Sequence, residues 1–342
     1  MMPMAAADLY GDVPPLRRST WRDFAPGLVV VGLGTLAAGF LSEHYGAPLT
    51  LMALLLGLSL NFLSSDKRLS TGLAFASQSL LRWGIVFVGA RVTGAQIVGL
   101  GPVALLSVVA IVAVTICIGV LVARQTGFDT SFGILAGGAV AICGASAAMA
   151  LATTLGSRRV SETQLTIVLV GIAAMSASAM VLYPIAAHAM HFSDVRAGFL
   201  LGASIHDVAQ ALGAGYGYSD AAGQIAAIVK LTRVALLAPV LALVAVVLPG
   251  EPGAGRVPKL PWFVAGFFAM AAVNSLGLIP AVVATASGGI ATACLAAAVT
   301  ATAIKSPLPK LLETGARPIL VIGLATLTAF ILALAAALLV AA

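Results

Sequence analysis

The chain has 342 residues, of which 61% are hydrophobic and only 9% are charged. Because a soluble domain needs roughly a quarter of its residues charged to cover its surface, this composition excludes a soluble protein. Abundant Gly, Ala and Leu with few β-branched alternations favour a helical membrane bundle over an outer-membrane barrel.

The formal net charge of +6 does not indicate a nucleic-acid partner. The basic residues lie between apolar runs, where loops of a membrane protein carry them, and do not form one patch. Three cysteines, Cys117, Cys143 and Cys294, lie inside apolar runs, so they do not form the disulfide framework of a secreted domain.

Apolar runs of about 20 residues predict transmembrane helices. Residues 1–23 form a basic segment that we expect in the cytoplasm, and 24–342 form a single transmembrane domain. The first run, from Phe24 to Leu41, carries no charge and is interpreted as a true span and not a removed signal peptide. The full prediction is eleven spans, at 24–42, 47–63, 70–90, 97–123, 130–155, 162–189, 196–213, 221–249, 261–277, 279–304 and 317–341.

The distribution of Lys and Arg between these spans predicts the orientation. With a cytoplasmic N-terminus and a periplasmic C-terminus, twelve of 18 basic residues face the cytoplasm of an inner-membrane protein: Arg17, Arg18, Arg22, Lys67, Arg68, Arg124, Arg196, Arg256, Lys259, Lys305, Lys310 and Arg317. Arg91, Arg158 and Arg159 face outward. A re-entrant 130–155 segment would bring the Arg158–Arg159 pair inside but would move the later loop cations outside, so eleven full spans are favoured.

A short pattern suggests an inverted repeat. Gly137-Gly138 precedes Cys143, and Gly288-Gly289 precedes Cys294 at the same spacing, on spans that run in opposite directions. The repeats would cover about 47–189 and 196–341, with 24–42 as an extra span.

Charged residues inside spans point to a function, because each is costly in lipid. Asp207 is the only acidic residue well inside a predicted span, whereas Arg82, Lys230 and Arg233 are three embedded cations. This positive balance suits an anion site. The alternative is that the cations pair with Asp207 and with carbonyls at helix ends.

Two further groups of residues complete the predicted site. His206 and Gln210 share a face of a continuous helix, with Asp207 one step round, which suggests a titratable cluster able to bind a coupling proton. Cys143, Gly144 and Ser146 follow a Gly-rich stretch that either permits close helix packing or marks an unwound helix whose N-terminus faces an anion.

These motifs resemble the YeiH family of bacterial membrane proteins, described as sulfate exporters. The similarity runs from about Phe24 to the C-terminus, and its elements are Leu-Leu-Arg82-x-Gly, Cys143-Gly144-x-Ser146, Ile-His206-Asp207-Val-Ala-Gln210, Val-Lys230-Leu-Thr-Arg233 and Lys259-Leu-Pro-Trp-Phe. The family more usually has Glu at the position of Asp207. The resemblance implies an inverted-repeat fold similar to bile-acid symporters and sodium–proton antiporters, with two broken helices crossing at mid-membrane, at spans 5 and 10.

The leading hypothesis is a secondary transporter of a small oxyanion, sulfate or an organosulfonate, with proton-coupled export as one mode. Arg82, Lys230 and Arg233 would attract the anion, Cys143, Gly144, Ser146 and Gln210 would contact it, and His206 and Asp207 would bind the proton. Expected partners are the anion, a proton or sodium ion, the lipid bilayer and a second copy in a homodimer. No cofactor or metal is expected.

Three alternatives remain open at the level of sequence. The chain could import organic carboxylates, form a passive channel, or act as a membrane-embedded enzyme through Cys143, His206 and Asp207. The enzyme is disfavoured because residues 206 and 207 point about 100° apart on a helix, which prevents Asp207 from orienting His206.

Overall fold

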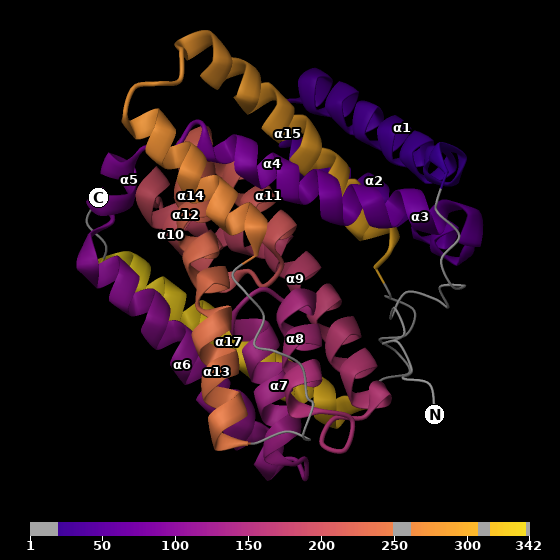
Figure 1. Ribbon diagram of the computed structural model, residues 1–342, viewed down its shortest axis with the longest axis vertical. Coiled ribbons are helices and arrows are strands. Elements are labelled where there is room, and N and C mark those ends of the chain that lie inside the picture. Colours follow the sequence, from indigo (N-terminus) through magenta and orange to yellow (C-terminus); the bar gives the residue numbers. More distant parts are fainter. Residues whose placement is uncertain (1–19, 249–260, 307–314, 340–342) are drawn as a thin grey trace.

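The computed structural model describes residues 20–248, 261–306 and 315–339, and the regular elements in this part are helices (Figure 1). Seven helices are long and apolar enough to cross a membrane, when Lys67–Gly89 and Asp220–Val247 are each counted as one helix. Four shorter helices are also apolar. The prediction of an all-helical, polytopic membrane protein is therefore confirmed. Arg17, Arg18, Arg256, Lys259 and Lys310 lie outside the described residues.

The helices follow one another through short connections. Their bounds are α1 Trp21–Tyr45, α2 Leu49–Ser59, η1 Asn61–Ser65, α3 Lys67–Phe75, η2 Ala76–Leu80, α4 Leu81–Gly89, α5 Gly94–Gly99, α6 Gly101–Gln125, α7 Thr130–Ala141, α8 Ala145–Leu155, α9 Glu162–Ala189, α10 Asp194–Ser204, α11 Val208–Tyr218, α12 Asp220–Ala235, α13 Leu237–Val247, α14 Trp262–Ser275, α15 Ala281–Ile304 and α17 Ala316–Leu339. The π-helical turn η2 joins α3 and α4 into one long rod.

The helices divide into two packed groups (Figure 1). The first, which we call the panel, consists of α1–α4, α14 and α15. The second, the hairpin bundle, consists of α6–α13 and α17. Glycines allow close approach within each group: a Cβ on Gly27 of α1 would lie 2.7 Å from the Cα of Gly72 in α3, and one on Gly119 of α6 would lie 2.6 Å from the Cα of Gly137 in α7. Small residues serve this role in membrane bundles, where close van der Waals packing holds helices together.

The segments α7–α8 and α10–α11 each fold back on themselves as a helical hairpin. In the first hairpin, a Cβ on Gly138 would lie 2.5 Å from the Cδ1 of Leu151, a contact that two collinear half-helices would not allow. In the second, the hydroxyl of Ser219 donates to Asp194 Oδ1 at 2.6 Å, so the start of α10 and the end of α11 lie together. Neither segment is the continuous helix of the eleven-span prediction, and the break in span 5 that the resemblance implied is present between Ala141 and Ala145.

The tips of both hairpins lie beside the middle of α9. A Cβ on Gly144, at the first tip, would lie 3.2 Å from Ile172 Cγ2. At the second tip, the backbone N–H of Asp207 donates to Ser176 Oγ at 3.0 Å. Since α9 connects the hairpins and its 28 residues extend about 42 Å, their open ends lie at opposite ends of this helix.

The implied break in span 10 is also wrong, because α15 is a continuous helix of 24 residues through Gly288, Gly289 and Cys294. A Cβ on Gly288 would lie 2.9 Å from Cδ of Arg91, so this glycine makes room for an arginine side chain. The Gly-Gly pattern shared with α7 therefore reflects two different packing needs and does not mark equivalent broken helices. The breaks lie in spans 5 and 7.

Candidate functional site

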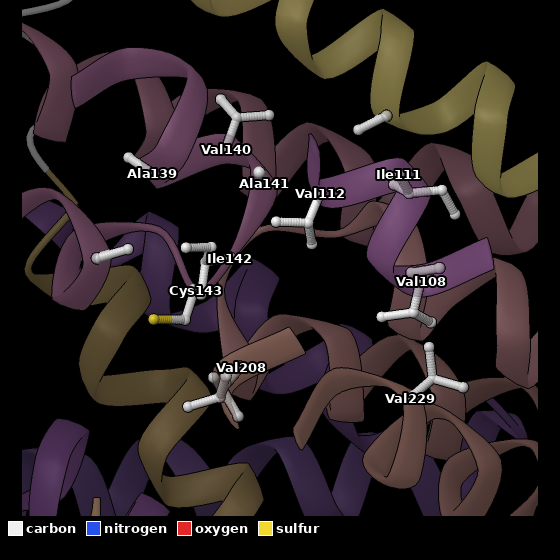
Figure 2. Close-up of a cluster of buried hydrophobic side chains, with 14 of the residues drawn as sticks. Val108, Ile111, Val112, Ala139, Val140, Ala141, Ile142, Cys143, Val208 and Val229 are labelled. Carbon is white, nitrogen blue, oxygen red and sulfur yellow. The ribbon is translucent and has the colours of Figure 1, made fainter. Parts of the chain in front are cut away.

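The two hairpin tips meet inside the bundle and bring four helix ends together. The first halves, α7 and α10, end there with their carbonyl groups, and the second halves, α8 and α11, begin there with their N–H groups. A Cβ on Gly144 would lie 3.8 Å from the Cα of Asp207, so the tips are adjacent. Figure 2 shows the apolar packing around the end of α7, where Ile142 and Cys143 lie near Val208 of α11.

Lys230 of α12 joins the two tips. Its ammonium is fully buried and donates to the carbonyl of Ile142 at 2.8 Å, to that of Ile205 at 2.8 Å, and to that of His206. A lysine ammonium has three donors, and here all three are used on backbone oxygens. Lys230 therefore satisfies carbonyls that the helix breaks would leave without partners in a region without water.

Arg233 acts in the same way one turn further along α12. Its Nε donates to Ala141 O at 2.8 Å and its Nη2 to Val140 O at 2.9 Å, both at the end of α7. Its Nη1 donates to Gly202 O at 3.1 Å and Ile205 O at 3.2 Å, at the end of α10. The guanidinium is fully buried. Both cations thus clamp the negative, C-terminal ends of α7 and α10.

This arrangement favours the second sequence-based explanation of the embedded cations, in which they pair with helix-end carbonyls. Neither cation forms an ion pair with Asp207 in the part of the chain that the structure describes. Their two positive charges nevertheless remain in the bundle, beside one carboxylate. The formal charges of the ionisable side chains at the tips therefore have a positive balance.

The N-terminus of α8 is open. Its N-cap is Gly144, which has no side chain to accept a hydrogen bond and adopts φ 66°, ψ −124°. The Cys143 thiol is buried. Among the described residues, the N–H groups of Ala145 and Ser146 have no acceptor, and Ser146 is exposed. The positive end of α8 therefore carries two N–H groups without an acceptor and one exposed hydroxyl.

The N-terminus of α11 is closed by its own side chain. Asp207 is the N-cap, and its Oδ1 accepts from the Gln210 N–H at 3.1 Å. The side chain of Gln210 is buried, and its Oε1 has no partner. The expectation that His206, Asp207 and Gln210 lie on one continuous helix is wrong, because His206 lies in the break and α11 begins after Asp207.

His206 is fully buried between the second hairpin and α17. Its Nε2 lies 2.9 Å from Thr326 Oγ1, and its Nδ1 has no partner. Thr326 also donates to the Ile322 carbonyl at 2.8 Å, so it can accept from an Nε2–H tautomer. Sequence reasoning missed Thr326 and Ser176, since hydroxyl residues in apolar runs are common and carry no distinguishing signal.

The structure does not bring Arg82 to this cluster. Arg82 lies in the first turn of α4, in the panel, and it is exposed. The other predicted residues, Cys143, Gly144, Ser146, His206, Asp207, Gln210, Lys230 and Arg233, lie at or beside the two tips. The sequence predicted that Arg82 lies in the middle of span 3, but it did not show which face of the helix carries this residue.

The geometry gives no support to a catalytic triad. Among the described residues, Cys143 and His206 make no hydrogen bond with each other, since the imidazole Nε2 contacts Thr326 and its Nδ1 has no partner. Within the described ranges, no group of three metal-binding side chains is present.

Comparison with known proteins places most of the chain in one family. The family model described as conserved hypothetical protein 698 matches residues 26–322. The UPF0324 membrane protein TauZ of Paracoccus denitrificans is 44% identical over 296 residues, which cover 85% of this chain and 88% of that protein. The UPF0324 membrane protein RA0957 of Rhizobium meliloti is 47% identical over 265 residues, 75% of each chain. No solved structure matches.

Proposed function

The chain belongs to the UPF0324 membrane protein family, which includes YeiH and TauZ, and we propose that it is a secondary active transporter of a small oxyanion such as sulfate or an organosulfonate. Membership of the family agrees with the resemblance found in the sequence. The protein is a multi-pass membrane protein, and the transport role rests on the geometry of the two hairpins.

The observation that carries the proposal is the meeting of two helical hairpins beside the middle of α9. Broken backbone at membrane depth is tolerated where it is enclosed by protein or lines a water-filled path. Lys230 and Arg233 satisfy the carbonyl groups at the ends of the first half-helices, and the N–H groups at the start of α8 remain without an acceptor among the described residues. Half-helix N-termini of this kind bind anionic substrate groups in transporters.

The hairpins also give a better account of the charges than eleven full spans. If α7–α8 and α10–α11 are re-entrant, nine spans remain: α1, α2, α3–α4, α6, α9, α12–α13, α14, α15 and α17. With a cytoplasmic N-terminus, Arg158 and Arg159 then move inside and Arg196 moves outside, and the later loop cations keep their side because two hairpins are introduced. Among the basic residues, only Arg91 and Arg196 then lie outside.

This topology supports an inverted arrangement of a different kind from the predicted one. The two hairpins enter from opposite sides of the membrane, the first from the cytoplasm and the second from the periplasm. Their tips meet where both could bind one ligand, and movement of the hairpin bundle against the panel would expose that ligand to either side. The proposed C-terminus is periplasmic, as it was with eleven spans.

The hydrogen-bond donors at the α8 N-terminus favour an oxyanion as the ligand. Two backbone N–H groups and the Ser146 hydroxyl offer three donors to a group that carries several acceptor oxygens. The buried charges of Lys230 and Arg233 favour a negative ligand at short range, and Asp207 offsets only part of their charge. His206 and Asp207 remain the groups proposed to bind a coupling proton.

The test is anion binding to the purified protein in lipid nanodiscs, followed by flux in proteoliposomes. We expect sulfate or ethanesulfonate to bind and Ser146→Ala to weaken that binding by about tenfold, the loss of one hydrogen bond to a charged group. Acetate and larger carboxylates serve as the competing class. Equal affinity in wild type and Ser146→Ala for every anion that binds would remove the α8 N-terminus from the site.

A further inference from the structure

A second polar site lies between the panel and the hairpin bundle. It is a cavity of about 490 Å³, large enough for a small organic molecule. Its walls come from the end of α4, the start of α12, the end of α14 and the first half of α15. The lining residues that matter for binding are Arg91, Asp220, Gln224, Asn274, Thr285 and Thr292.

The position of the cavity separates it from the hairpin tips. Asp220 directly follows Ser219, whose hydroxyl bonds to Asp194 at the open end of the second hairpin. Lys230, which marks the level of the tips, lies ten residues further along α12, or about 15 Å. The cavity is therefore near the membrane surface on the side from which the second hairpin enters.

One ion pair crosses the cavity. The Nη2 of Arg91 donates to Asp220 Oδ2 at 3.2 Å, and the two side chains are 27% and 72% exposed. Among the described residues, this is the hydrogen bond that the Arg91 guanidinium makes, so its other N–H groups are available. The pair is one of several contacts between the panel and the bundle, which also include the Thr50 hydroxyl donating to the Gly213 carbonyl at 2.6 Å.

The surface of α15 is shaped to hold Arg91 in this place. Its Cδ lies 2.9 Å from the position that a Cβ on Gly288 would occupy, and its Nη1 lies 3.2 Å from the same position. Any larger residue at 288 would push the arginine away. Gly289 lines the cavity next to it and leaves bare backbone there. The glycine pair thus positions the guanidinium and keeps the cavity open.

The charges of this cavity cancel, which determines the class of ligand. A simple anion drawn to Arg91 would be repelled by Asp220 a few ångströms away, and a simple cation would be repelled by Arg91. A zwitterion can place its anionic group on Arg91 and its ammonium on Asp220. Arg91 and Asp220 then each exchange the other for an opposite charge on the ligand. Gln224, Asn274, Thr285 and Thr292 supply uncharged hydrogen-bonding groups around it.

We propose that this cavity binds a small zwitterion, a molecule with an ammonium and a sulfonate or carboxylate a few bonds apart. The ligand inserts into the Arg91–Asp220 pair and replaces the direct hydrogen bond between these two side chains. The site stands on its own residues and does not depend on the oxyanion site at the hairpin tips.

The experiment measures calorimetric affinity of the full-length protein in nanodiscs for matched probes. These are 3-aminopropanesulfonate, propane-1-sulfonate, which lacks only the ammonium, and 4-aminobutanoate as the carboxylate zwitterion. We expect at least one zwitterion to bind ten times more tightly than propane-1-sulfonate. Asp220→Asn should lower that zwitterion's affinity at least tenfold and reduce its advantage over propane-1-sulfonate to less than threefold.

Two further variants make the result specific. Gly288→Ala keeps both charges but crowds Arg91, and we expect a similar loss of zwitterion binding. Ser146→Ala, at the hairpin tips, should leave it unchanged, so failure of this site and failure of the oxyanion site can be told apart. Equal binding of the sulfonate with and without its ammonium, absence of binding by both zwitterions, or no effect of Asp220→Asn would overturn the proposal.

Discussion

Replacing Lys230 with methionine tests whether this lysine holds the two hairpin tips together. Methionine has a similar length and no charge, so the change removes three hydrogen bonds, to the carbonyls of Ile142, Ile205 and His206, with little change in volume. Each hydrogen bond to a charged group contributes about 1.5–3 kcal/mol, and a buried acceptor left without a partner costs about 1–3 kcal/mol.

The loss of these hydrogen bonds is offset in part, because the mutation also removes a buried charge whose desolvation costs several kcal/mol. Deleting one member of a buried charged network typically costs about 3–5 kcal/mol, and we expect a loss of unfolding free energy in that range for Lys230→Met. A lysine that only attracted the anion, the role that the sequence suggests for Lys230, would not cost this much stability when replaced.

The assay is reversible unfolding of the purified protein by denaturant in mixed micelles, with Arg82→Gln as the matched control. Arg82 is exposed in the panel, so its loss should change stability by no more than about 0.5 kcal/mol. Hydrogen exchange should accelerate at Gly144 and Asp207 in Lys230→Met and not in the control. If the unfolding free energy of Lys230→Met lay within about 1 kcal/mol of the wild-type value, Lys230 would not hold the two hairpin tips together.

The remaining predictions concern the tips and the topology. Gly144→Ala should lower stability by about 1–3 kcal/mol, since φ 66°, ψ −124° is accessible almost only to glycine, and normal unfolding of this variant would contradict the backbone described. A cysteine at position 158 should react with a membrane-impermeant maleimide only after the cells are permeabilised, whereas one at 191 should react in intact cells; the reverse pattern would exclude two re-entrant hairpins. Anion affinity should rise as the pH falls, because a proton taken up at the tips adds positive charge beside the anion, and His206→Gln should flatten this dependence. If wild type and mutant show the same calorimetric pH dependence, the coupling group is Asp207.

The sequence by itself determined the class of the protein and most of the residues that gather at the two hairpin tips. Length of apolar runs and scarcity of charge required membrane helices, because lipid offers no hydrogen bonds to an open backbone. The cost of charge in lipid identified Lys230, Arg233 and Asp207 as residues with a specific role. The sequence also contained the anomaly of Arg158 and Arg159, which an eleven-span topology left on the wrong side.

Only the tertiary structure showed that the chain folds back on itself at 130–155 and 196–213. A hairpin of two half-helices and one continuous helix have nearly the same apolar content, so hydropathy does not distinguish them. The difference lies in contacts between distant segments: carbonyls of α7 and α10 with Lys230 and Arg233, and the tips with α9. The exposed position of Arg82 and the unbroken helix at Gly288 could not be predicted for the same reason. Packing decides which side of a helix faces a neighbour, and local composition does not encode packing.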